Sequence, residues 1–297
     1  MYYKSVMLKE CIEALRIQPG GIYVDATFGG RGHTREILRH LKGGKLFAFD
    51  QDEDAVQNKP DDPRITMISS NFRYLKNFLK LYKAVPADGI LADLGISSHQ
   101  IDTPGRGFSS RFDGPLDMRM DQRKKTTAAD ILNRREEEEL EGIFRTYGEL
   151  RNSAKLARTI VTSRKRKRIQ TTAELKEILL PLAGKGRENK FYAQVFQSLR
   201  IEVNQELEAL KELLKQGIQV LRPGGRMAVL SYHSLEDRLV KDFFRSGNFT
   251  GTIEKDFYGN PLAPVKTIGR KPVVPDPEEI AHNPRARSAR LRIAEKI

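Results

Sequence analysis

Short apolar segments alternate with segments of helical spacing along the first hundred residues, and this alternation limits the fold more than any other feature. Strands are predicted at four apolar segments, residues 21–26, 45–50, 64–69 and 87–93. The segments between them carry apolar residues at helical spacing. Repeated β–α units of this length predict an α/β fold with a doubly wound, mostly parallel sheet and helices on both faces.

The pattern changes after residue 102. Residues 103–120 are rich in Gly, Pro, Asp and Arg, which predicts a loop. Residues 128–182 have helical spacing, and Thr171 with Glu174 matches a capping box at a helix start. This part of the chain is predicted to be a mostly helical, basic insert.

The α/β pattern then returns. Its predicted elements are a helix, a strand, a second helix and a final edge strand, at residues 207–221, 226–231, 234–244 and 290–295. We therefore expect one cofactor-binding α/β domain made of residues 1–104 and 205–297. The helical insert, an RNA-recognition domain by its charge, is expected at residues 105–204.

The formal net charge of +13 is concentrated in a few places. Residues 151–190 hold 12 Lys or Arg and 3 Glu, and residues 285–297 hold 5 Lys or Arg and 1 Glu. Clustered positive charge attracts polyanions through counterion release, and RNA and DNA are the commonest partners. The densest run is expected to contact phosphates, with a solvated helix end as the alternative: Arg164, Lys165, Arg166, Lys167 and Arg168.

Composition excludes several other classes of protein. No run of 18 apolar residues is long enough to cross a membrane, and the N-terminus lacks the apolar core of a secretory signal, so we expect a cytoplasmic protein. The single cysteine, Cys11, excludes a disulfide framework and a thiolate-rich metal site. His33, His99 and His233 show no ligand spacing, so no metal is expected.

A glycine-rich loop at residues 25–33 follows the first predicted strand and opens a helix. Glycines such as Gly30 let the backbone approach a ligand closely. The loop departs from the dinucleotide fingerprint, because Arg35 takes the place of the third small residue. Asp25 and Asp93 end the first and fourth strands, where carboxylates would repel a pyrophosphate. S-adenosylmethionine presents an ammonium and a sulfonium and no phosphate, so it fits this edge better.

Two further residues support this cofactor. Asp50 ends the second strand about twenty residues after the loop, where a carboxylate accepts hydrogen bonds from ribose hydroxyls. Phe72 follows the third strand and is placed to pack on an adenine ring. The alternatives are that Asp25 and Asp93 cap local turns and that Phe72 belongs to the core.

The methyl acceptor is expected to be a nitrogen or oxygen atom. Methylation of pyrimidine carbon-5 typically requires a cysteine nucleophile, and Cys11 lies far in sequence from the strand ends. Asp93 begins the stretch Asp-Leu-Gly-Ile-Ser-Ser-His-Gln, at the position where nucleic-acid amino-methyltransferases place oxygens that bind an exocyclic amine. The stretch lacks the Pro-Pro-aromatic sequence of the DNA enzymes.

Motifs spread along nearly the whole chain resemble one family, the bacterial 16S ribosomal RNA cytosine-N4 methyltransferases (RsmH or MraW). The most specific motifs are Asp-Gly-Pro-Leu-Asp-Met-Arg-Met at 113–120 and Ser-Tyr-His-Ser-Leu-Glu-Asp-Arg at 231–238. The others lie at 25–33, 88–98, 106–109, 196–204, 221–225 and 283–288.

The resemblance implies a class I, Rossmann-like methyltransferase fold with an inserted helical domain. It implies S-adenosylmethionine as donor, 16S rRNA of the small ribosomal subunit as partner, and N4 of a cytidine in the decoding centre as target. The cofactor residues carried over by motif are Arg31, Gly32, His33, Asp50, Phe72, Asp93 and Gln100. Gly30, which lies in the same loop, is added to this set. Arg31 is expected to contact the cofactor through its backbone. His99 and Tyr232 stand where Pro and Phe are common in the family, and both changes are taken as neutral.

The catalytic residues are predicted less directly. Asp93, with an oxygen from Ser97, is expected to position the cytosine amino group. The loop at 113–120 is expected to close over the flipped base, with Asp113 or Asp117 as proton acceptor. The alternative is that these aspartates pair with nearby arginines and order the loop. His233 is a further catalytic candidate, with a structural role as its alternative.

Two other classes of function stay open at this point. One is a methyltransferase that acts on another nucleic acid or on a protein amino group. The other is an RNA-binding protein that keeps the fold without the activity. The sequence also leaves the oligomeric state open, a homodimer included.

Overall fold

The computed structural model describes residues 5–259 and 262–297, which form two compact units. The first unit is made of Met1–Gly95 and Leu207–Ile297, and the second of Ile96–Glu206. The second unit contains the insert expected at 105–204 but begins earlier in the chain. The reason is that Ile96 packs against the apolar core of the second unit.

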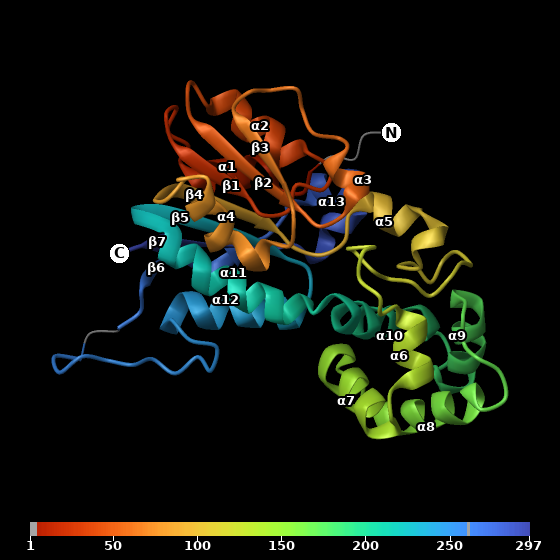
Figure 1. The fold of residues 1–297 in the computed structure, drawn as a ribbon. Coiled ribbons are helices and arrows are strands. Elements are labelled where there is room, and N and C mark those ends of the chain that lie inside the picture. Colours follow the sequence, from red (N-terminus) through yellow and green to blue (C-terminus); the bar gives the residue numbers. More distant parts are fainter. Residues whose placement is uncertain (1–4, 260–261) are drawn as a thin grey trace. The chain divides into compact units, whose positions relative to one another are not determined.

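A seven-stranded sheet forms the centre of the first unit, in the order β3-β2-β1-β4-β5-β7-β6 (Figure 1). β1 to β5 are parallel, and β7 is antiparallel to both of its neighbours. The strands are β1 (Ile22–Asp25), β2 (Lys45–Asp50), β3 (Ile65–Ser69), β4 (Ala87–Asp93), β5 (Leu221–Ser231), β6 (Val265–Val273) and β7 (Arg290–Lys296). The mixed α/β fold with a mostly parallel sheet is confirmed.

One strand assignment was wrong. The segment predicted as a final edge strand, β7, lies between β5 and β6, and β6 is the edge strand. Sequence analysis missed β6 because its residues are mostly exposed and it contains Gly269 and Pro272, both of which weaken a strand pattern. The pairing of β6 with β7 shifts register between Ile268 and Val273, on either side of that glycine and proline.

Helices cover both faces of the sheet (Figure 1). Apolar residues of α4 (Leu75–Leu81), α11 (Glu206–Val220) and α12 (Ser234–Ser246) pack in one core cluster, and those of α1 (Leu8–Leu15) and α2 (Gly32–His40) in another. The shorter helices of this unit are α3 (Glu53–Val56), η1 (Phe72–Tyr74), α13 (Pro277–His282) and η4 (Pro284–Ser288). This two-faced cover is what the alternating β–α pattern predicts.

The second unit is helical. Its elements are α5 (Ser98–Asp102), η2 (Pro104–Arg106), α6 (Ala128–Arg134), α7 (Glu137–Gly148), α8 (Ser153–Arg164), α9 (Thr172–Leu179), η3 (Leu180–Leu182) and α10 (Glu188–Asn204). The capping box is confirmed, because Thr171 Oγ1 accepts the Glu174 amide and Glu174 Oε2 accepts the Thr171 amide. Across residues 5–259 and 262–297, no helix has the length and apolarity to span a membrane.

The string Asp-Gly-Pro-Leu-Asp-Met-Arg-Met is a packed part of the second unit and not a free lid. Leu116, Met118 and Met120 are buried in its core. The Asn204 side chain accepts the Met120 amide at 2.8 Å and donates to the Met118 carbonyl at 2.8 Å. The buried Arg106 guanidinium donates to the Arg119 carbonyl at 3.0 Å. These bonds hold the segment that sequence analysis expected to close over a base.

Candidate active site

Three of the five parallel strands end on an aspartate at one edge of the sheet. These residues are Asp25 of β1, Asp50 of β2 and Asp93 of β4. The crevice outside the carboxyl ends of the strands is where an open α/β sheet binds its ligand. The three carboxylates have different surroundings, and the differences separate their roles.

Asp25 organises the glycine loop. Its Oδ1 accepts the Thr27 amide at 3.1 Å, and its Oδ2 accepts the Thr34 hydroxyl at 2.7 Å. Its side chain is buried, and burial raises the pKa of this carboxyl against the opposing effect of His33 and of both hydrogen bonds. The sequence suggested a carboxylate that faces the cofactor directly, but the geometry favours the alternative, a local structural anchor.

The loop itself leaves a few amides for a ligand. Gly29 and Arg31 adopt left-handed backbone conformations, with φ of 43° and 60°. The Arg31 amide donates to the Phe28 carbonyl at 2.8 Å, and the Arg31 carbonyl accepts the Arg35 amide. The Arg31 N–H is therefore already used within the loop. The amides of Gly30 and Gly32 donate to no acceptor among the residues that the structure describes. A helix begins at Gly32, so these amides suit an anionic group.

The Asp50 carboxylate accepts two backbone amides and can accept further hydrogen bonds. Its Oδ2 accepts the Gly29 amide at 2.8 Å, and its Oδ1 accepts the Asp52 amide at 2.9 Å. Each carboxylate oxygen keeps a second lone pair, which is what two ribose hydroxyls need. Burial raises the pKa of Asp50 to about 6, while the two amide bonds oppose the rise.

Phe72 lies in η1 just after β3, half-buried against the core, so part of its ring is available to a ligand. Two neighbours that sequence analysis did not single out fix this corner. Asn71 Nδ2 donates to Gln51 Oε1 at 2.9 Å, and the Asn71 side chain also accepts the Arg73 amide. The bond between Asn71 and Gln51 ties the end of β3 to the end of β2. Asn71 and Gln51 are both polar residues just after the end of a strand. This position is the only sequence signal that could have marked them.

Asp93 sits at the centre of a hydrogen-bonded group. Its Oδ1 accepts the Tyr232 hydroxyl at 2.6 Å, and its amide donates to Thr27 Oγ1. Its Oδ2 lies 3.7 Å from Nδ1 of His33. His33 Nε2 lies 3.1 Å from the Val6 carbonyl, which can only accept, so Nε2 carries a proton and Nδ1 is the nitrogen that faces Asp93. Burial raises the pKa of Asp93, while His33 and Tyr232 oppose the rise.

Tyr232 therefore has a role that sequence analysis missed. The change from Phe to Tyr at this position was taken as neutral, but the added hydroxyl donates to the carboxylate of Asp93. Burial, together with the neighbouring Asp93, raises the pKa of Tyr232 well above its usual value, so the hydroxyl stays protonated and donates.

Cys11 lies closer to this group than its place in the sequence suggested. Its side chain is buried, and its pKa is raised well above the usual value, first by burial and then by the charge of Asp93. A thiol held in its protonated form is a poor nucleophile. The structure thus agrees with an acceptor atom other than pyrimidine carbon-5.

His233 serves as the N-cap of α12. Its Nδ1 accepts the Glu236 amide at 3.4 Å, and its Nε2 lies 3.2 Å from Oε1 of the same residue. Glu236 is buried, and its Oε2 accepts the Tyr232 amide at 2.9 Å. Both ring nitrogens therefore face Glu236, which favours the structural alternative, and a catalytic role for His233 stays an untested prediction.

Asp113 and Asp117 are held by bonds inside the second unit. Asp113 accepts the amides of Ala173 and Gly114 and the hydroxyl of Thr172, and the first of these bonds contributes most to lowering its pKa. Asp117 binds the Arg119 guanidinium through both oxygens, at 2.8 and 2.7 Å. Burial would raise the pKa of Asp117, but Arg119 outweighs burial and the pKa is lowered.

Carboxylates with lowered pKa values are weak bases, so we expect Asp113→Asn and Asp117→Asn to keep the wild-type single-turnover methylation rate. Both variants should instead unfold at lower denaturant concentration, because they lose bonds that order the insert. Single-turnover kinetics and a denaturant titration check this pair of outcomes. A rate that falls while the unfolding midpoint stays constant would restore the proton-acceptor hypothesis.

Ser97 and Gln100 cap the first helix of the second unit. Ser97 Oγ accepts the Gln100 amide at 3.2 Å, and Gln100 Oε1 accepts the Ser97 amide at 3.1 Å. The Ser-x-x-Gln spacing of a capping box was the signal for this arrangement. Their predicted roles, amine positioning by Ser97 and cofactor binding by Gln100, stay untested.

The basic run divides into structural and available residues. Arg164 donates to the carbonyls of Leu132 and Arg135 at the end of α6, at 2.8 and 2.6 Å, so it serves the fold of the insert. Lys167 pairs with Glu174 at 2.7 Å. The remaining three cations of the run are exposed: Lys165, Arg166 and Arg168. They form no ion pair with any residue that the structure describes.

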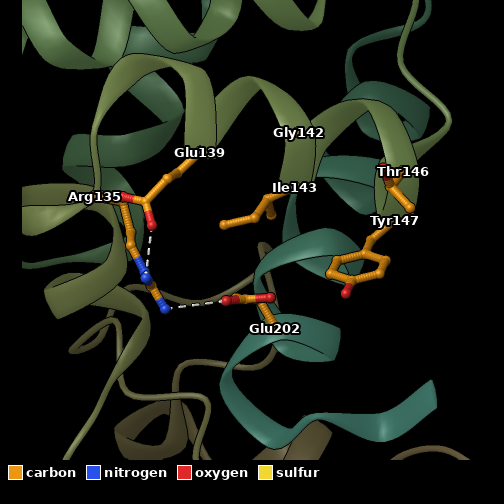
Figure 2. Close-up of a pocket in the computed structure, with 7 residues that line it drawn as sticks. All are labelled: Arg135, Glu139, Gly142, Ile143, Thr146, Tyr147 and Glu202. Atoms are coloured by element: carbon orange, nitrogen blue, oxygen red, sulfur yellow. Dashed lines mark hydrogen bonds and ion pairs between the residues drawn. The ribbon is translucent and has the colours of Figure 1, made fainter. Parts of the chain in front are cut away.

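A separate hollow of about 260 Å³ lies in the second unit (Figure 2). Arg135 lies between Glu139 and Glu202 at its wall, at 2.8 and 3.4 Å. Ile143 and Tyr147 contribute apolar surface. None of the predicted site residues lines this hollow.

The strand edge fits S-adenosylmethionine. This cofactor has a carboxylate for the loop amides, ribose hydroxyls for Asp50 and no phosphate for the aspartates to repel. The fold and this edge together define an S-adenosylmethionine-dependent methyltransferase.

The chain belongs to the MraW methylase family, whose family model matches residues 1–297. Among curated relatives, "Ribosomal RNA small subunit methyltransferase H" of Cytophaga hutchinsonii is 59% identical, with both chains covered completely. The protein of the same name from Flavobacterium johnsoniae is 56% identical over 100% of this chain and 98% of the relative. Likeness to solved structures is much weaker. A Streptococcus thermophilus rRNA methylase is 12% identical, with a TM-score of 0.43 and coverage of 100% of this chain and 99% of the other.

Proposed function

We propose that this protein transfers a methyl group from S-adenosylmethionine to N4 of a cytidine in 16S rRNA, in the decoding centre of the small ribosomal subunit in the cytoplasm. The observation that carries the proposal is the 59% identity, over the full length of both chains, to a relative named as a ribosomal RNA small subunit methyltransferase. The nitrogen acceptor is supported by Asp93 at the active edge and by the protonated, buried Cys11. The proposal requires no homodimer.

Incubation of the protein with methyl-labelled S-adenosylmethionine and small subunits from a strain that lacks the gene tests this proposal. We expect label in 16S rRNA and recovery of N4-methylcytidine after digestion to nucleosides. Label in DNA or protein would identify a different methyltransferase. Cofactor binding without any transfer would identify a binding protein. Naked 16S rRNA offered in parallel shows whether the assembled subunit is needed.

The chemistry of the acceptor falls to Asp93. When bound, S-adenosylmethionine supplies a methyl group attached to a positively charged sulfur. The cytosine nitrogen that forms the new bond to carbon must lose one proton, as the carbon–sulfur bond breaks. We propose that the Asp93 carboxylate first accepts a hydrogen bond from the amine and then takes this proton. Ser97 Oγ already accepts the Gln100 amide, so the proposal gives the main positioning role to Asp93.

Tyr232 and His33 position Asp93 in this scheme. The Tyr232 hydroxyl holds Oδ1, which leaves Oδ2 to the substrate amine. His33 Nδ1 faces Oδ2 at 3.7 Å and provides a second place for the proton after transfer. With the proton on His33, the imidazole would carry one positive charge next to the Asp93 carboxylate. The proton thus stays within one hydrogen-bonded group of side chains.

The second unit is proposed to bind RNA phosphates through Lys165, Arg166 and Arg168. Replacing these three with serine should lower the slope of log affinity against log salt by roughly 2 to 3, because each phosphate contact contributes about 0.7–0.9. Measuring the affinity for 16S rRNA across a series of salt concentrations gives this slope. Serine at Lys42, Lys45 and Lys80, three exposed residues of the first unit, removes the same charge and serves as control. Equal slopes for the two triple variants would contradict the assignment.

A further inference from the structure

A hairpin between α12 and β6 presents two aromatic side chains at its tip. The Leu262 amide donates to the Glu254 carbonyl at 2.8 Å and joins the two arms. At the tip, Asp256 Oδ1 accepts the Tyr258 amide at 2.9 Å, and the Gly259 amide donates to the Asp256 carbonyl at 3.0 Å. Gly259 has a φ of 85°, which favours glycine. This turn places Phe257 and Tyr258 at its centre.

The base of the hairpin is built into the first unit. The Phe249 ring stacks on Phe243 of α12, with centroids 4.9 Å apart and planes 18° apart. Arg245 donates to the Gly251 carbonyl at 2.9 Å, and Asn248 Nδ2 donates to the Thr252 carbonyl at 2.8 Å. Residues 248–259, which follow α12, project away from the sheet (Figure 1). The tip is therefore carried on an anchored base.

Folding does not account for the two aromatic residues at the tip. Phe257 is 98% exposed and Tyr258 is 86% exposed. Their rings meet edge to face, with centroids 5.6 Å apart, and neither joins a core cluster. Burying side chains of this size away from water would stabilise the fold, so their exposure is unfavourable for the isolated protein. An exposed pair of large aromatic side chains is typical of a surface that binds a partner.

The surroundings of the tip are basic. Residues 245–273 hold five basic and two acidic side chains. Lys255 precedes the tip, and the edge strand β6 exposes Lys266, Arg270 and Lys271. Within residues 5–259 and 262–297, none of these four side chains forms an ion pair with a carboxylate. Lysines protect an edge strand from pairing with other strands, but exposed aromatic rings would promote association. The combination instead fits a polyanion whose bases can stack.

We infer that Phe257 and Tyr258 stack on unpaired bases of the RNA substrate while the cations of β6 contact its phosphates. The surface would be a second RNA contact, on the first unit, besides the basic run of the insert. The inference rests on the proposed function, because it assumes that the substrate is RNA. Aromatic stacking with nearby cations is a general way to hold single-stranded RNA.

The double variant Phe257→Ser with Tyr258→Ser tests the inference. Because both side chains are exposed, the fold should be unaffected. Stacking contributes about 1–3 kcal/mol per base, so affinity for 16S rRNA should fall about 5- to 150-fold for each base that stacks, with an unchanged salt slope. The pair Phe257→Leu and Tyr258→Leu, which keeps apolar surface without rings, should also bind weakly. The pair Phe257→Tyr and Tyr258→Phe should bind as wild type does. Leu81→Ser, at a residue 71% exposed on α4, is the control.

A spectroscopic readout separates stacking from other contacts. The chain contains no tryptophan, so Tyr258→Trp introduces a single tryptophan at the tip, which can be excited selectively at wavelengths that tyrosine does not absorb. Its emission should be quenched on addition of RNA, and the quenching should saturate with binding.

The outcomes distinguish this inference from the proposed function. A wild-type protein that binds no RNA contradicts the proposed function itself. Wild-type RNA binding with an unaffected serine double variant overturns only the inference. Weaker binding to whole subunits, with unchanged binding to protein-free 16S rRNA, would mean that the tip contacts a ribosomal protein, which also overturns it.

Discussion

Asp93→Asn is expected to lower the single-turnover rate of methyl transfer by roughly 10²- to 10⁴-fold, the usual contribution of a positioned proton acceptor. Asparagine keeps the size of the side chain and an oxygen that accepts from Tyr232. It cannot take a proton from the substrate amine. The rate at saturating cofactor and RNA measures the effect, and calorimetry with the cofactor alone shows whether binding survives. A wild-type rate would remove Asp93 from the chemistry.

Tyr232→Phe gives a finer test of the same group. The variant keeps the ring and removes the hydroxyl that lowers the pKa of Asp93. Asp93 acts as a base only when ionised, so the rate falls as pH drops through its pKa. Loss of the hydrogen bond raises that pKa, and the acidic limb of the pH–rate profile should move to higher pH. His33, Asp25, Glu236 and Cys11 also face Asp93, so the comparison is made against the wild-type profile. An unmoved acidic limb would mean that Tyr232 only fills space.

The second large effect is expected at Asp50. Hydrogen bonds to a charged group contribute about 1.5–3 kcal/mol each, so Asp50→Ala should weaken S-adenosylmethionine binding roughly 100-fold or more. Asp50→Asn keeps one acceptor oxygen and should lose less. Asp61→Asn, at an exposed residue after α3, should bind as wild type does. Calorimetric dissociation constants decide the comparison, and an unchanged constant for Asp50→Ala would place the ribose elsewhere.

Binding should also depend on pH through Asp50. Its pKa is raised to about 6, mainly by burial, and only the ionised form accepts two hydroxyl bonds. Affinity should therefore be constant above about pH 7 and fall as pH drops below 6. The stability of the fold depends on the ionisation of Asp50 in the opposite direction. A carboxyl whose pKa is higher in the folded than in the unfolded protein stabilises the fold at low pH, and this contribution is lost as pH rises through 6. In the absence of cofactor, the Asp50→Asn variant should not show this loss of stability as pH rises through 6.

Local patterns predicted the elements that depend on neighbours in sequence. The bounds predicted for β2 and β4 match those of the structure, because both segments are mostly apolar and end on aspartate. The capping box at Thr171 was also predicted, since its two bonds join residues three apart. β6 was missed because its stability comes from pairing with β7 and not from its own composition.

The site residues divide in the same way. Asp50 and Phe72 were predicted to bind the cofactor because strand ends in a parallel sheet share one edge. The partner of each carboxylate was not predictable, since Tyr232 is 139 residues from Asp93. Asp113 and Asp117 looked catalytic in sequence because two carboxylates stood in a loop. Their bonds to Ala173 and Arg119 appear only in the folded insert.

The sequence by itself determined the α/β class, the glycine loop, the acidic strand ends and the basic insert, because each depends on residue type and short spacing. Only the tertiary structure decided which aspartates bind backbone amides, which binds a tyrosine hydroxyl and which pairs with an arginine. A carboxyl group takes its role from its hydration and its partners, and those come from distant parts of the chain. The same holds for Phe257 and Tyr258, which the fold leaves in water.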